Sequence, residues 1–287
     1  MSRETERVIG MNDFMNTMAE KAREVMQPGD YTGTDGLVYC GKCHTPKQKR
    51  FADGIYAGCV VPCLCRCGKE KRDREEAAEK AIEKGKRIAD LKERGFLSRS
   101  MQNWTFENDN GQNPQMEKAR KYAENWDRVK EKNIGLLIWG DVGCGKSYLA
   151  AAIANALMER EIPVRMTNFN AIMNDLAGTF EGRNEYLDRL SGYPLLIIDD
   201  FGMERGTEYG LEQIFSVIDG RYRSRKPLIV TTNLTLTEMR SAQDTAHRRI
   251  YDRVRDMCVP LQCTGKSFRE RNAEEKFAEL KDIFSEG

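Results

Sequence analysis

The chain has no long apolar run and no excess of charge. Its hydrophobic stretches all fall short of the roughly 20 residues that a membrane-spanning helix needs, and its first residues lack the apolar core of a signal peptide. The 46 basic and 45 acidic residues leave a net charge of +1. This excludes a global positive field that would draw the protein onto nucleic acid, so any such contact requires a local patch or several assembled copies. We expect a cytoplasmic protein with no membrane partner.

Cysteine is plentiful instead, with nine residues, six of them between positions 37 and 67. In a reducing cytoplasm such cysteines are expected as metal ligands or buried thiols rather than disulfides. A CxxC pair is followed by a second close cluster, and four thiolates around Zn²⁺ can stabilise a small domain that has little core of its own. The predicted zinc ligands are Cys40, Cys43, Cys65 and Cys67. Cys63 is the alternative to one of the last two, Cys59 and His44 are weaker candidates, and free thiols are the other interpretation.

Two stretches beside the cysteines follow helical patterns. Residues 4–26 repeat Met, Ala and Val at steps of three and four, which predicts a helix packed within the protein or against a neighbour, with a partner-docking face as the alternative. Residues 68–95 form a charged helix with opposite charges four apart, typical of a solvated connector. We divide the chain into a zinc-binding helical domain at 1–95, a linker at 96–115 and a larger domain at 116–287.

The larger domain alternates apolar strands with amphipathic helices, and its sequence contains no internal repeat. The predicted strands are 135–140, 162–168, 193–200, 226–233 and 257–263. The predicted helices are 148–160, 169–179, 211–223 and 245–257. Strands that are apolar throughout and separated by helices indicate a parallel sheet covered on both faces, which is an α/β fold.

The strongest motif is a complete G-x-x-x-x-G-K-S between Gly140 and Ser147, placed after a predicted strand and before a predicted helix. Its glycines let the backbone direct N–H groups at phosphate oxygens, and the helix N-terminus adds positive charge. Lys146 would contact the β- and γ-phosphates, and the Ser147 hydroxyl would bind Mg²⁺. The residues predicted to bind the nucleotide are Gly140, Asp141, Val142, Gly143, Cys144, Gly145, Lys146, Ser147 and Tyr148. A glycine-rich turn with an incidental lysine is the alternative.

Polar residues follow two further strands, and a helix carries a pair of arginines. Asp199 suits the water shell of Mg²⁺, while Asp200, pointing the other way from the strand end, would orient the attacking water. Asn233 would contact the γ-phosphate or that water, unless it only caps a turn. Arg249 and Arg253 lie four apart on one helix face, where one would reach the γ-phosphate of a neighbouring subunit. A plain basic surface helix is the alternative for this pair.

The runs GLLIWGDVGCGKSYLAAAIANAL, LLIIDDFG, RSRKPLIVTTNL and RIYDRV…GKSFR together resemble the DnaC/DnaI/IstB group of AAA+ ATPases over residues 116–270. The cysteine-rich front, with its YCxxCxTPK start, resembles phage-type helicase loaders. The resemblance implies an AAA+ P-loop sheet, with Lys146 and Ser147 in Walker A and Asp199 in Walker B. Asp200 stands where most AAA+ proteins carry Glu, which implies slow ATP hydrolysis.

The same resemblance implies further roles for individual residues. Asn233 matches the sensor-1 position, and Arg253 is the preferred arginine finger of the predicted pair. Arg269 matches a late arginine of the family whose contact is left open. The family relies on the helix after the second strand, here residues 169–183, for single-stranded DNA, although this helix carries few basic residues.

The function implied is that of an ATP-dependent helicase loader in DNA replication. Its zinc-binding front would grip a replicative hexameric helicase, and its AAA+ domain would bind ATP, Mg²⁺ and single-stranded DNA. Self-association would place ATP at subunit interfaces. An IstB-like transposition regulator, and a switch that binds ATP with little hydrolysis, are the alternatives.

Overall fold

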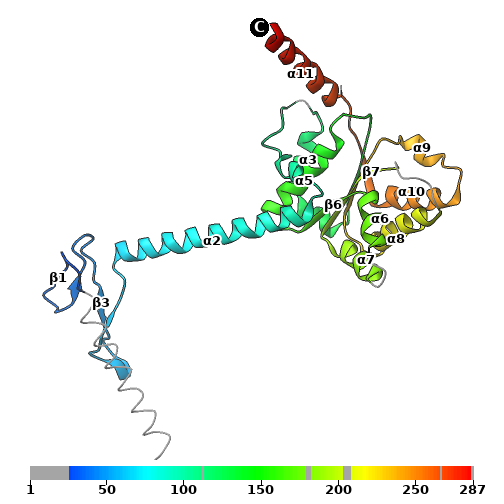
Figure 1. The fold of residues 1–287 in the computed structure, drawn as a ribbon. Helices are drawn as coiled ribbons and strands as arrows, with labels where there is room; N and C mark the ends of the chain where they lie inside the picture. The colour runs from blue at the N-terminus through cyan, green and yellow to red at the C-terminus, as the bar shows by residue number, and fades with distance from the viewer. Residues whose placement is uncertain (1–25, 112, 179–181, 203–207, 266, 286–287) are drawn as a thin grey trace, which may run out of the picture. The chain divides into compact units, whose positions relative to one another are not determined.

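The computed structural model describes residues 26–111, 113–178, 182–202, 208–265 and 267–285. Nearly all of the helix expected at 4–26 therefore lies outside the described residues. The chain forms two compact units, Met1–Lys84 and Gly85–Gly287, and the boundary between them falls inside the long helix α2, Arg66–Gly95, drawn in cyan in Figure 1. None of the described helices is long and apolar enough to cross a membrane.

The first unit contains two short antiparallel hairpins ahead of α2. In the first, β1 (Tyr31–Thr32) pairs with β2 (Val38–Tyr39), and in the second, β3 (Gln48–Arg50) pairs with β4 (Val60–Pro62). A 3-10 turn at Gly54–Tyr56 lies between β3 and β4. Among the described residues of these hairpins, the buried apolar side chains are those of two cysteines, so the unit has almost no hydrophobic core of its own.

The second unit is built on a five-stranded parallel sheet, as the alternating pattern predicted. Its strands are β5 (Gly135–Trp139), β6 (Val164–Thr167), β7 (Leu195–Phe201), β8 (Leu228–Thr232) and β9 (Cys258–Gln262). They lie in the order β6-β7-β8-β5-β9, with every neighbouring pair parallel. All five were predicted to within two residues of their ends. The strand that opens into the glycine-rich motif, β5, is therefore flanked on both sides.

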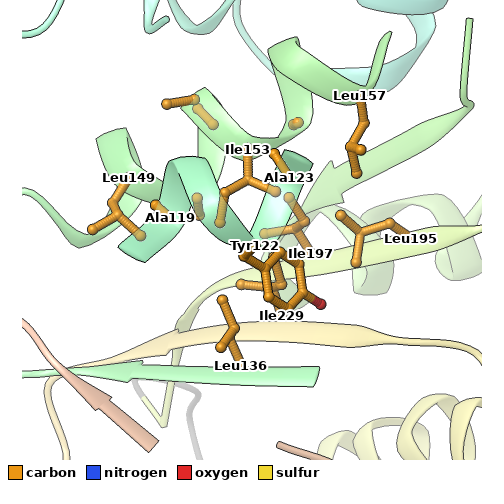
Figure 2. Close-up of a cluster of buried hydrophobic side chains, with 14 of the residues drawn as sticks. Ala119, Tyr122, Ala123, Leu136, Leu149, Ile153, Leu157, Leu195, Ile197 and Ile229 are labelled. Atoms are coloured by element: carbon orange, nitrogen blue, oxygen red, sulfur yellow. The ribbon is translucent and has the colours of Figure 1, made fainter. Parts of the chain in front are cut away.

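Helices cover both faces of this sheet. On one face, α3 (Met116–Glu124) and α5 (Lys146–Glu159) pack together above the strands, as Figure 2 shows for Ala119, Tyr122, Leu149 and Ile153. On the other face lie α6 (Phe169–Ala177), α7 (Arg183–Gly192), α8 (Glu208–Ser224) and α10 (Thr245–Met257). Successive strand residues alternate between the two cores because side chains alternate across a strand. This double burial explains why the strands are apolar throughout.

Four shorter or peripheral helical elements complete the unit. They are α4 (Trp126–Glu131), α9 (Leu236–Arg240), α11 (Phe268–Ser285) and the 3-10 turn Arg99–Asn103. Helices α3, α4, α7, α9 and α11 were not predicted. The first four have ten residues or fewer, so each offers at most about three turns of helical pattern. The short helix α9 begins with a reciprocal capping box between Thr235 and Glu238, a local signal that the sequence does contain.

Residues 96–115, expected as a linker, pack against the sheet domain. Phe96 and Phe106 are buried in the core beside α3 and α5. The side-chain amide of Asn155, itself buried in α5, donates hydrogen bonds to the backbone carbonyls of Met101 and Trp104, each at 2.9 Å. The segment predicted as an irregular link is thus packed onto the sheet domain through its few apolar residues. Periodicity alone could not reveal that, since the segment is irregular.

Candidate nucleotide and metal sites

The glycine-rich motif forms a tight loop between β5 and α5. Gly145 adopts a left-handed conformation with φ of 90° and directly precedes the first turn of α5. Gly140 has φ of 149°, and a Cβ atom there would lie 2.1 Å from the carbonyl oxygen of Cys263. A side chain at Gly140 would therefore clash with backbone as well as adopt a strained conformation. The loop thus leads directly into the N-terminus of α5, a setting that favours binding of an anion.

Lys146 lies at the centre of this loop, and its side chain is almost fully buried. The ammonium donates hydrogen bonds to the carbonyl oxygens of Gly140, at 2.9 Å, and Asp141, at 2.7 Å. It also donates to Oδ1 of Asn233, at 2.7 Å. The residue predicted for sensor 1 is thus in direct contact with the predicted phosphate-binding lysine, although the two lie on different strand ends.

Asp199 is buried at the end of β7, next to Ser147. Its carboxylate accepts a 2.5 Å hydrogen bond from the Thr231 hydroxyl, and the Ser147 hydroxyl lies close enough to lower its pKa. Burial raises the pKa of Asp199, and these two hydroxyls partly oppose the rise. The two predicted Mg²⁺ ligands, Ser147 and Asp199, therefore lie next to each other. Thr231 was not predicted as a site residue, although it belongs to the TTN ending of its strand.

Asp200 faces the site because the strand is irregular at this position. The register between β7 and β8 shifts between Ile198 and Phe201, where β7 has one extra residue, a β-bulge. Asp200 takes φ of 54°, its N–H is bonded to the Thr231 hydroxyl at 3.0 Å, and its side chain is exposed. The two neighbouring carboxylates are therefore placed differently: Asp199 is buried, whereas Asp200 is exposed and borders the cavity beside the loop.

That cavity has a volume of about 690 Å³ and is bordered by Lys146, Ser147, Asp200 and Asn233. It is also lined by residues that the sequence analysis placed in a linker or left unassigned. They are Trp104, Asn108, Asp109, Asn110, Asn113, Met116 and Phe268. Trp104 stacks on Tyr148 at 5.9 Å between ring centroids, which gives the cavity an aromatic wall. The run of asparagines after Trp104 was the signal that could have indicated a polar binding segment.

The predicted arginine pair lies together on α10, packed against α8. The guanidinium groups of Arg249 and Arg253 lie over the ring of Phe215, at 4.9 and 4.3 Å from its centroid. Arg253 also forms a 2.7 Å ion pair with Asp219. Neither arginine lines the nucleotide cavity of its own chain. A role at a phosphate would therefore require a second subunit.

In the first unit, the fold brings four of the cysteines together. The sulfur atoms of the predicted set Cys40, Cys43, Cys65 and Cys67 all lie within 4.8 Å of one another. Two of the separations are 3.5 Å, from Cys40 to Cys67, and 3.4 Å, from Cys65 to Cys67. Zn–S bonds of about 2.3 Å in a tetrahedron place sulfur atoms about 3.8 Å apart, so this set fits the ion.

The alternative ligand, Cys63, lies outside this group. Its thiol is directed at the carbonyl oxygen of Pro46, at 3.6 Å, and burial raises its pKa. Within the group, the Thr45 hydroxyl lowers the pKa of Cys43 to about 5, whereas hydrogen bonds with the neighbouring thiols raise that of Cys67 to about 12. Four thiols this close cannot all ionise without a cation, and a divalent metal would remove that conflict.

Comparisons with known proteins agree with this geometry. A sequence profile described as IstB-like ATP binding protein matches residues 68–276, well over half of the chain. The chain belongs to the IstB-like ATP-binding family. The matched region contains the P-loop, Asp199 and Asn233, and it begins directly after Cys67, so the cysteine cluster is not part of what defines the match.

Individual members and solved structures are similar over part of their length. The replicative helicase loader DnaC of Escherichia coli strain K12 is 34% identical over 163 residues, 54% of this chain and 64% of DnaC. The uncharacterized protein YqaM of Bacillus subtilis strain 168 is 30% identical over 152 residues, 50% of this chain and 48% of YqaM. The chain thus spans between about half and two thirds of these relatives. The crystal structure of DnaI has a TM-score of 0.50 at 24% identity, covering 60% of this chain and 94% of that one, and this likeness supports the fold.

Membership in the IstB-like family makes this an ATP-binding chain with the predicted AAA+ fold. Two expectations drawn from the resemblance remain predictions. The helix expected to contact single-stranded DNA ends at Ala177 and contains no basic residue, with Arg183 opening the next helix. The side chain of Arg269 lies outside the described part of the structure.

Proposed function

We propose that this IstB-like protein is an ATP-dependent loader that delivers a replicative hexameric helicase to single-stranded DNA. The observation that carries the ATPase part is that Lys146, Ser147 and Asn233 border one cavity, with Asp199 buried next to Ser147. Similarity to a replicative helicase loader supports the loading part. The cysteine module, which precedes the family match, is the segment proposed to grip the helicase.

In this proposal, ATP binds with its phosphates against the P-loop, and Lys146 exchanges its carbonyl partners for phosphate oxygens. Ser147 and Asp199 hold Mg²⁺, which neutralises developing charge on the phosphates. Asp200 orients the attacking water from its exposed position, and Asn233 fixes the same water or the γ-phosphate. Arg253, or Arg249 beside it, completes the site from a neighbouring subunit, so that nucleotide state controls self-association.

The shorter carboxylate at position 200 leads to a direct test of hydrolysis. Asp200→Asn should lower kcat by about 100-fold or more, because it removes the base that activates water. Affinity for ATP should change little, because asparagine tolerates the left-handed conformation and the loop is untouched. Phosphate release and fluorescent-nucleotide binding measure the two effects. Asp188→Asn, an exposed change on α7, is the matched control. Equal turnover in both variants would remove Asp200 from the mechanism.

The loading role is tested by complex formation with the full chain. Mixed with its cognate hexameric helicase and ATP, the protein should co-elute in size-exclusion chromatography. A Cys65→Ser variant should lose the complex, while Cys63→Ser should keep it, because Cys63 lies outside the sulfur cluster. If no hexameric helicase forms a complex with the unaltered chain, the loading function is refuted.

The family match favours one rival, a transposition regulator of the IstB type. Such a protein would bind duplex DNA and a transposase in place of a helicase. Stable binding to a transposase, together with absence of a helicase complex, would reverse the assignment. The nucleotide site is common to both functions, so the Asp200 experiment does not depend on this choice.

A further inference from the structure

Helices α9 and α10 enclose a second hollow, separate from the nucleotide cavity. Its volume is about 510 Å³, and it is lined by four arginines and one carboxylate. The arginines are Arg240, Arg248, Arg249 and Arg255, and the carboxylate is Asp252. In a chain with a net charge of only +1, this is a strong local concentration of positive charge.

The spacing of these residues explains why they converge. Arg248, Asp252 and Arg255 follow one another at steps of four and three, so they form a stripe on one face of α10. The opposite face, with Ile250, Val254 and Met257, is buried in the core. Arg240, at the end of α9, approaches the stripe from a second element. The hollow is therefore formed by tertiary structure and is not a feature of one helix.

Three of these arginines have no acidic partner in the described part of the chain. No ion pair within 4 Å is found there for Arg240, Arg248 or Arg255, and all three are exposed. Arg253, which lies on another face of α10, is by contrast paired with Asp219 of α8. The four guanidinium groups outnumber the single carboxylate of Asp252, so they repel one another, and a bound anion would relieve that repulsion.

We propose that this hollow binds the phosphodiester backbone of single-stranded DNA, an inference that rests on the proposed function. The backbones of Arg248 and Arg255 lie about 10 Å apart along the helix axis, so their long side chains can contact more than one phosphate of a strand. Arginine forks recognise phosphate oxygens in pairs and carry no sequence information by themselves. The hollow thereby supplies the basic contact that α6 lacks.

The test compares the full chain with the double variant Arg248→Ala/Arg255→Ala. Binding of a fluorescent oligothymidylate is measured by anisotropy, with ATP and Mg²⁺ present, over a series of salt concentrations. The variant should bind about tenfold or more weakly, and the slope of log affinity against log salt should flatten by about 0.7 for each arginine lost. A mixed-sequence oligonucleotide should be affected equally, because backbone contacts are sequence-independent. Arg249 is left intact because it belongs to the arginine pair.

Arg128→Ala, an exposed arginine on α4 with the same charge change, is the control and should leave affinity unchanged. An unchanged salt slope in the double variant would overturn the proposal. So would a loss confined to ATP turnover, because the hollow would then face a neighbour's nucleotide instead of DNA. If the unaltered chain binds the helicase but not DNA, the DNA-binding role of the hollow is refuted, while the proposed binding of a helicase is not. If it binds DNA through these arginines but no helicase, the loading function fails instead.

Discussion

Lys146→Ala should weaken ATP binding by about 100-fold or more, because one ammonium makes several charge-assisted hydrogen bonds that no other side chain replaces. Its present oxygen acceptors, two loop carbonyls and Asn233, hold the ammonium at the loop proposed to bind the phosphates. Isothermal titration with a slowly hydrolysed ATP analogue and Mg²⁺ measures the affinity. ATP turnover should fall at least in proportion.

The control for this variant is Lys118→Ala, which removes an exposed ammonium from α3. Thermal unfolding of both variants separates lost binding from lost folding, because Lys146 also holds the loop carbonyls in the nucleotide-free chain. Lys146→Arg keeps the charge but enlarges the group, and it should bind ATP more weakly than the unaltered chain. Unchanged affinity in a folded Lys146→Ala protein would refute the nucleotide site itself.

Cys65→Ser should release the metal and unfold the hairpin unit, leaving the sheet domain folded. The expected loss is large because structural zinc sites contribute about 10–16 kcal/mol of apparent binding energy. The hairpins bury almost no other apolar side chains that could compensate. Zinc content per chain, measured by atomic absorption, and proteolysis of the first unit report the change. Nucleotide binding should persist, because the P-loop belongs to the other compact unit.

Cys63→Ser is a matched control for this variant. It removes a neighbouring thiol that is directed at the carbonyl of Pro46 and not at the sulfur cluster. Zinc content should therefore remain at one ion per chain. Full zinc retention in Cys65→Ser would show that Cys65 is not a zinc ligand. Loss of zinc in Cys63→Ser would favour the alternative set, in which Cys63 is a ligand.

The sheet and the P-loop follow from local sequence alone. Strands buried on both faces must be apolar throughout, and the loop requires glycines where side chains would clash. Both features can therefore be recognised from the residue types alone. Gly140 illustrates this, since even a Cβ atom would contact the backbone of Cys263. The CxxC spacing likewise indicated the cluster of four cysteines, because ligand geometry restricts how cysteines can be placed.

Several decisive features depend on residues that are distant in the chain. The bulge that turns Asp200 into the cavity arises from pairing between β7 and β8. The alternation of side chains within one strand does not determine the register in which that strand pairs with its neighbour. The aromatic and asparagine residues of 104–111 and 113 line the nucleotide cavity, and α5 holds this segment through hydrogen bonds from Asn155 and Tyr148. The arginine hollow needs α9 beside α10.

The sequence by itself therefore determined the fold class, the phosphate loop and the cysteines that converge, because each depends on chemistry repeated at short, regular spacing. Tertiary structure decided which way Asp200 faces, which segment encloses the cavity and where positive charge gathers. Those outcomes rest on contacts between elements far apart in the chain, and such contacts impose no periodic pattern on the residues that make them.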